Sequence, residues 1–185
     1  MWDISSHTHI YYMIKLTKYQ ETELRKFIDD TGNKNGVNVI PLPHSGELSG
    51  FRIWEPHDYY DYFVSLDSSL SEKYYIALDE TTTFDELKQC IKKTIFELTA
   101  YDYLMMNLEK LDLIYDVNTN EFGQIVNCEV YLPDDTTHGI FIEYSELNDC
   151  SCDIEDEDSG CYTISACDMK ATKRQIRTCI KELFK

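Results

Sequence analysis

The chain contains little glycine and proline, with 7 and 4 copies among 185 residues. Phosphate-cradling loops need residues without a Cβ atom, so this scarcity disfavours them. No Gly-x-Ser-x-Gly elbow, P-loop, His-Glu-x-x-His motif or glycine-rich dinucleotide turn occurs. The sequence therefore displays no active site. We expect a protein that is not an enzyme, and a Cys/His site assembled in space by the fold stays open as the alternative.

Long apolar runs are also missing, since no stretch approaches eighteen consecutive apolar residues. The first residues show no positive region followed by an apolar run and a small-residue cleavage site. The seven cysteines are an odd number, which fits a reducing compartment better than a disulfide framework. These observations predict no membrane span and a location in the cytoplasm of the host cell.

Positive charge is scarce, because 17 basic residues face 34 acidic ones and the formal net charge is −17. Such a chain repels nucleic acid and anionic membranes and is attracted to basic surfaces. The charge is uneven. Residues 168–185 carry six basic and two acidic residues, whereas residues 1–167 carry 11 and 32.

Three helices are predicted where a capping box precedes an apolar stripe of helical spacing. Gly32 is the predicted end of the first helix, and residues 100–109 are expected to extend the second. Residues 83–92 resemble residues 172–181, which leaves open a duplication or, as we favour, convergence on one amphipathic pattern. The capping pairs are Thr17/Gln20, Thr83/Glu86 and Thr172/Gln175.

Between the helices the pattern favours strands, and residues 59–70 are ambiguous, with a short helix as one interpretation. We predict one α+β domain over residues 1–185, with a weak subdivision near 41–50. Its sheet is mainly antiparallel, with about six or seven strands and about three helices largely on one face. The predicted strands are 11–16, 51–54, 74–78, 111–117, 124–132, 140–144 and 162–165.

The stretch from Asn148 to Cys161 reads NDCSCDIEDEDSGC and invites a metal interpretation. A zinc site would use Cys150, Cys152, Cys161 and Cys167. However, structural zinc sites normally contain two Cys-x2–4-Cys pairs, and here the carboxylates would add negative charge around four thiolates. We therefore expect no metal and no cofactor, with zinc as the less favoured alternative, and interpret the stretch as a mobile acidic loop between two strands.

Acidic residues interleaved with tyrosine form the remaining candidate site. Carboxylates spread over a rigid fold can occupy a basic groove, because each basic residue gains a charge-assisted partner and phosphates are excluded. The predicted partner-binding residues are Asp58, Tyr59, Tyr60, Asp61, Asp149, Asp153, Glu155, Asp156, Glu157 and Asp158.

Small size, strong acidity, abundant tyrosine and these two runs together resemble small phage-encoded inhibitors of host defence, of the anti-CRISPR and anti-restriction type. The resemblance implies a non-enzymatic inhibitor that binds a basic nucleic-acid-processing host protein, above all a CRISPR effector nuclease, and blocks nucleic-acid binding or cleavage. An immunity protein or antitoxin that neutralises a basic toxic nuclease remains an alternative. No direct nucleic-acid or membrane partner is expected, and the sequence leaves the oligomeric state open.

Overall fold

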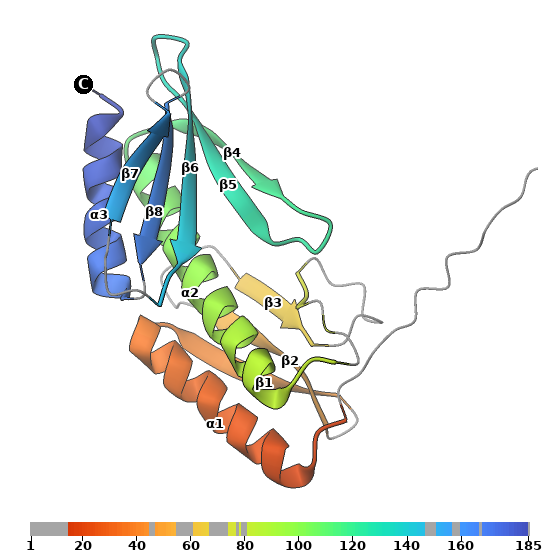
Figure 1. Cartoon of the computed structure of the whole chain (residues 1–185). Helices are drawn as coiled ribbons and strands as arrows, with labels where there is room; N and C mark the ends of the chain where they lie inside the picture. The colour runs from red at the N-terminus through yellow and green to blue at the C-terminus, as the bar shows by residue number, and fades with distance from the viewer. Residues whose placement is uncertain are drawn as a thin grey trace, which may run out of the picture.

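The computed structural model confirms the predicted α+β class (Figure 1). Residues 43–44, 61 and 151–156 are described by their backbone alone. The residues that the structure describes are 15–44, 47–54, 61–66, 74–76, 78, 81–146, 151–156, 160–166 and 168–184.

Helix α1 spans Lys18–Asn35 and begins with the predicted capping box. The Gln20 N–H donates to the Thr17 hydroxyl over 3.2 Å, and the Thr17 N–H donates to the Gln20 side chain over 3.0 Å. The prediction that Gly32 ends the helix is wrong, because Gly36 is the C-cap in the left-handed conformation. Gly32 instead lies buried against Val39, whose Cγ2 atom would be 2.5 Å from an added Cβ.

Helix α2 spans Phe84–Glu109, begins with the capping box of Thr83 and Glu86, and continues without a break through the predicted extension. Helix α3 spans Met169–Glu182, and its N-cap is Asp168 rather than the predicted Thr172. Thr172 is buried in the first turn, where its hydroxyl donates to the Asp168 carbonyl oxygen over 2.8 Å. The match between residues 83–92 and 172–181 thus pairs a cap with a helix interior, which favours convergence.

A three-stranded antiparallel sheet has the order β1-β2-β3, with β1 at Asn38–His44, β2 at Glu47–Trp54 and β3 at Asp61–Ser65. Strand β1 was not predicted because it contains two prolines, but an edge strand tolerates proline since one side of it has no partner. The interpretation of residues 59–70 as a short helix is wrong where β3 forms. Of the predicted strand at 74–78, only a single bridge between Ser65 and Tyr75 is described.

A five-stranded sheet has the order β4-β5-β6-β8-β7. Neighbouring strands are antiparallel except β6 and β8, which are parallel. The acidic stretch therefore does not form the predicted loop throughout, because residues 151–156 pair with β8 as an edge strand. The bounds are Ile114–Thr119 for β4, Ile125–Tyr131 for β5, Thr137–Tyr144 for β6, Ser151–Asp156 for β7 and Cys161–Ala166 for β8.

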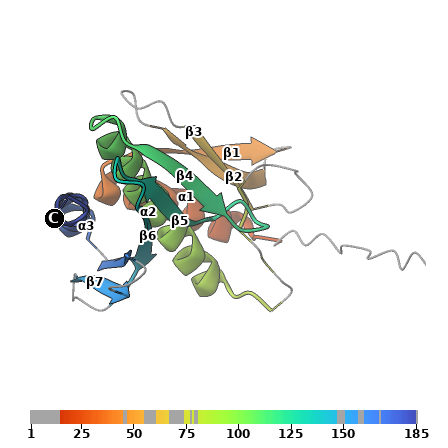
Figure 2. The same cartoon turned by 90° about the horizontal axis from the view of Figure 1, so that it is seen from above.

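Helix α2 joins the two sheets by contributing to two hydrophobic cores. Its first half, including Leu87 and Ile91, packs with α1 and the three-stranded sheet. Its second half, including Leu104 and Leu108, packs with α3 and the five-stranded sheet. Twenty-six residues make a helix about 39 Å long, enough to cross both layers. Seen from above, α3 lies on the side of the molecule remote from the three-stranded sheet (Figure 2).

Candidate functional site

The segment that forms the five-stranded sheet carries almost all of the net charge. Residues 111–166 contain 14 acidic residues and no lysine or arginine. The rest of the chain holds the other 20 acidic residues and all 17 basic ones. This segment therefore accounts for −14 of the net charge of −17.

One face of this sheet is buried and the other is not covered by a described helix. Cys128 and Val130 of β5 belong to the core that includes α2 and α3. The alternating residues of β5, Asn127, Glu129 and Tyr131, point to the opposite face because successive side chains alternate across a strand. We call this opposite face the acidic face. It presents Asp116 of β4 beside Glu129 of β5, as their register requires.

Two carboxylates thus stand directly opposite each other on neighbouring strands. The Tyr131 hydroxyl donates to Asp116 Oδ2 over 2.9 Å, and this contact is exposed. The same hydroxyl lies 3.4 Å from Glu129 Oε2, a contact that is partly buried. Its hydrogen bond to Asp116 is the main cause that raises the pKa of Tyr131. Within the described part of the chain, no basic side chain forms an ion pair with either carboxylate. Facing like charges oppose folding, so this pair is suited to a cationic partner.

The predicted acidic runs fall in different places. Residues 58–60, 149, 157 and 158 lie outside the described residues, and Asp61 begins β3 in the other sheet. Asp153, Glu155 and Asp156 belong to β7, where Asp153 pairs with Thr163 and Asp156 with Cys161. The backbone of residues 151–156 is therefore part of the sheet that presents Asp116 and Glu129, whereas Asp61, the described member of the first run, belongs to the other sheet.

Sequence reasoning missed Asp116, Glu129 and Tyr131. Two signals were available. Polar and apolar residues alternate with period two in residues 114–118 and 127–131, which assigns them to opposite faces of strands. In addition, residues 111–166 contain no lysine or arginine, so these strands supply no such side chain to neutralise the carboxylates on this face.

The hairpin of β4 and β5 diverges from β6 beyond the Cys128–Ile140 pair (Figure 1). The Tyr101 hydroxyl donates to the Val126 carbonyl oxygen over 3.0 Å and accepts from the Ile142 N–H over 2.9 Å. One helical turn earlier, Glu97 Oε1 accepts from the Tyr144 N–H over 3.3 Å. Residues i and i+4 of a helix thus satisfy β6 backbone groups where β5 has moved away.

This divergence leaves β5 exposed near its start and creates a cavity of about 350 Å³ between β5, β6 and α2. Val126 is 47% exposed at the point where the register between β4 and β5 shifts at a bulge. Burial raises the pKa of Glu97, which lies in this cavity with Lys93 3.7 Å away. The β4–β5 hairpin therefore extends away from β6 beyond Cys128.

The described cysteines have the properties of structural residues. Burial raises the pKa of Cys128 to about 12 and also raises the pKa of Cys90, so both thiols are protonated near neutral pH. Of the four cysteines in the alternative zinc site, the side chain of Cys161 alone is described. Among the described residues, no group of three His, Cys, Asp or Glu side chains is placed to hold a metal ion.

No described helix combines the length and the apolar character that crossing a membrane requires. Comparison with protein-family models, with curated proteins and with solved structures gave no match.

Proposed function

We propose that this protein is a non-enzymatic inhibitor that binds a basic, nucleic-acid-processing host protein through the acidic face of its five-stranded sheet. The observation that carries the proposal is the Asp116–Glu129 pair, which is held in register on neighbouring strands without a described cation beside it. A CRISPR effector nuclease is the partner class implied by the compositional resemblance.

Two carboxylates facing each other across strands cost about 0.2–1 kcal/mol of stability. A lysine or arginine of the partner converts this repulsion into two charge-assisted hydrogen bonds. The surrounding segment contributes 14 negative charges that steer a basic surface toward the sheet. Once bound, the basic residues of the partner are no longer available to phosphates.

Tyr131 adds an aromatic ring and a hydroxyl to the same surface. Ile114 lies opposite Tyr131 in the register and is 72% exposed. Tyrosine is enriched at protein–protein interfaces because it buries a large area with few rotatable bonds. The acidic face therefore combines charge, which steers encounter, with an apolar anchor, which holds a complex.

The proposal is tested by affinity capture from host lysate with three immobilised baits: the wild type, Asp116→Asn/Glu129→Gln and a matched control. The control is Asp29→Asn/Asp30→Asn on α1, where both residues are exposed and the change in net charge is the same. We expect the wild type and the control to retain one basic nucleic-acid-processing protein that the Asp116/Glu129 variant loses.

Retention of the same protein by all three baits would contradict the proposed site. Capture of a protein without a basic nucleic-acid-binding surface would contradict the proposed function. If the captured protein is a toxin encoded beside its inhibitor, the immunity-protein alternative replaces the CRISPR effector.

A further inference from the structure

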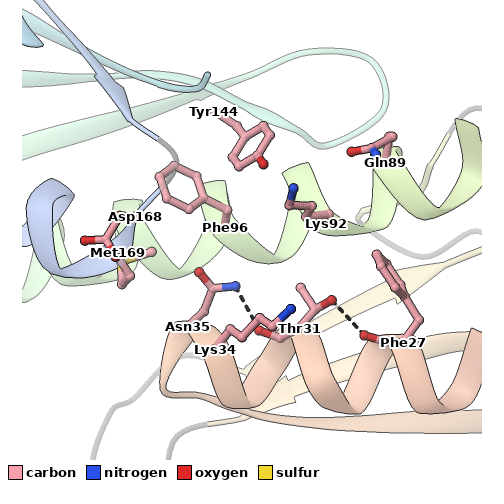
Figure 3. A pocket seen from close by; sticks show the side chains of 10 residues that line it. All are labelled: Phe27, Thr31, Lys34, Asn35, Gln89, Lys92, Phe96, Tyr144, Asp168 and Met169. Atoms are coloured by element: carbon pink, nitrogen blue, oxygen red, sulfur yellow. Dashed lines mark hydrogen bonds between the residues drawn. The ribbon is translucent and has the colours of Figure 1, made fainter. Parts of the chain in front are cut away.

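A second cavity, of about 410 Å³, lies where the two layers of the fold meet. It is bounded by the last turns of α1, the first half of α2, the end of β6 and the start of α3 (Figure 3). None of Asp116, Glu129 and Tyr131 lines it. Its volume falls within the range of sites that hold small organic ligands.

The cavity has basic groups in an otherwise acidic protein. Lys34 and Lys92 reach it from opposite sides, one from α1 and one from α2 (Figure 3). Lys34 has no described carboxylate or aromatic partner. Lys92 lies 3.8 Å from Glu146, whose side chain is 67% exposed, and such an exposed pair is weak. Lys92 Nζ also lies 5.0 Å from the centre of the Tyr144 ring, and both of its contacts are weak ones that an anion can supplement.

The one carboxylate in the lining is directed to its own helix. Asp168 Oδ1 accepts from the Ala171 N–H over 2.7 Å as the N-cap of α3. Asp168 keeps its negative charge, which the positive end of the α3 dipole partly offsets, and the lining holds two ammonium groups against this one carboxylate. The basic pair, rather than the aspartate, sets the charge preference of the cavity.

Aromatic rings form the apolar wall. Phe96 and Tyr144 pack edge to face with their centroids 5.2 Å apart, and Phe27 lies across the cavity on α1 (Figure 3). Two amide side chains stand at its border. Asn35 donates through Nδ2 to the Thr31 carbonyl oxygen over 2.9 Å, which leaves its own carbonyl oxygen as an acceptor, and Gln89 is exposed.

We propose that this cavity binds a nucleoside monophosphate. Its phosphate lies between Lys34 and Lys92, since a phosphate monoester carries up to two negative charges and two ammonium groups match it. Its base lies against the ring of Phe27, because a flat ring stacks on an aromatic side chain without regard to sequence and Lys92 already lies over the Tyr144 ring. The side-chain amides of Asn35 and Gln89 supply hydrogen-bond donors and acceptors for the edge of the base.

The test is titration of the full-length protein with adenosine 5′-monophosphate, adenosine and inorganic phosphate, followed by calorimetry and amide chemical shifts. It is done at about 0.15 M salt, where the negative field of the acidic sheet is screened beyond about 8 Å. We expect the monophosphate to bind at least about tenfold more tightly than either fragment, because it makes the contacts of both the phosphate and the ring. A tenfold difference in affinity corresponds to only about 1.4 kcal/mol. Shifts are expected at Thr31, Asn35 and Gln89.

Two variants locate the site. Lys34→Met should weaken monophosphate binding by about tenfold or more, as loss of a charge-assisted contact implies. Lys26→Met removes the same charge from an exposed position of the same helix and should change the affinity less than about twofold. Thermal melts of both variants in the absence of nucleotide verify that neither has lost its fold.

Absence of monophosphate binding at millimolar concentration would overturn the proposal. Equal binding of inorganic phosphate and the monophosphate would also overturn it, because the ring would then contribute nothing. Equal weakening by the two lysine variants would reduce the effect to net charge and contradict the assigned site. Each outcome is independent of the acidic face and of its partner.

Discussion

The outer faces of the two sheets differ in chemistry although both are open. The three-stranded sheet aligns Ile40, Arg52 and Phe63 across its strands, with the Arg52 guanidinium 5.2 Å from the centre of the Phe63 ring. The five-stranded sheet aligns Asp116 with Glu129. The first face pairs its charge with an aromatic ring of its own layer, whereas the second leaves two like charges together. That difference is the reason why the proposed contact is assigned to the five-stranded sheet.

The largest expected effect is on stability and comes from removing the contact that Tyr101 makes with the backbones of β5 and β6. Tyr101→Phe removes the hydroxyl that satisfies both the Val126 carbonyl oxygen and the Ile142 N–H. Leaving the buried Ile142 N–H without a partner costs about 1–3 kcal/mol and the partly buried Val126 carbonyl oxygen costs less, so we expect a loss of about 2 kcal/mol in the free energy of unfolding. Urea unfolding measures it. Tyr103→Phe, which loses only an exposed contact with Arg177, is the matched control.

A charge reversal at position 129 tests the repulsion on the acidic face directly. Glu129→Lys places an ammonium opposite Asp116, which changes a repulsive cross-strand pair into an attractive one. We expect stability to rise by about 0.5 kcal/mol while partner binding weakens at least about tenfold. Asp29→Lys makes the same change in net charge on α1 and should leave binding nearly unchanged. A loss of stability in Glu129→Lys would contradict the assigned repulsion.

A pH series tests how Glu97, beside the gap between β5 and β6, affects the stability of the fold. Burial raises the pKa of Glu97 above its usual 4.5, so the folded protein holds this proton more tightly than the unfolded chain. The resulting stability is full at low pH and is lost as the pH rises through the pKa of the folded state. Glu97→Gln keeps an acceptor for the Tyr144 N–H and cannot ionise.

We therefore expect Glu97→Gln to melt above the wild type at pH 7.5 and the difference to shrink toward pH 4. Lost contact with the exposed Lys93 offsets little of this gain. Thermal melts at four pH values between these limits provide the measurement. A difference that grows on acidification would mean that the ionised carboxylate stabilises the fold.

The smallest effect is expected at the apolar face. Ile40→Thr/Phe63→Thr removes two exposed apolar side chains from the three-stranded sheet. Partner affinity should change by less than about twofold, because the proposed contact lies on the other sheet. Loss of capture by this variant would move the binding site to the three-stranded sheet.

The helices were largely predictable from sequence because their signals are local. Thr17 and Thr83 cap as their capping boxes predict, and the apolar stripe of α2 continues to its end. The two errors have local physical causes. Gly32 is needed inside α1 for its close approach to Val39, and Asp168 caps α3 one turn before Thr172.

The division into two sheets depends on long-range pairing and was not predictable in this way. Strand β8 enters between β6 and β7, and β7 forms from a stretch whose charge favoured a loop. The acidic face follows from that pairing, because Asp116 and Glu129 meet only through the register of β4 and β5. The composition predicted an acidic surface, and the predicted binding residues were consecutive acidic residues along the chain. The acidic face described above consists instead of alternate residues of neighbouring strands.

The most direct measurement is the affinity of the captured partner for this protein over a salt series, with and without the nucleic acid of the partner. Salt screens the attraction between an acidic and a basic surface, so we expect the affinity to fall at least about tenfold between 0.05 and 0.5 M salt. We also expect bound nucleic acid to prevent binding. An affinity independent of salt, or a stable complex of both with the partner, would contradict the proposed function.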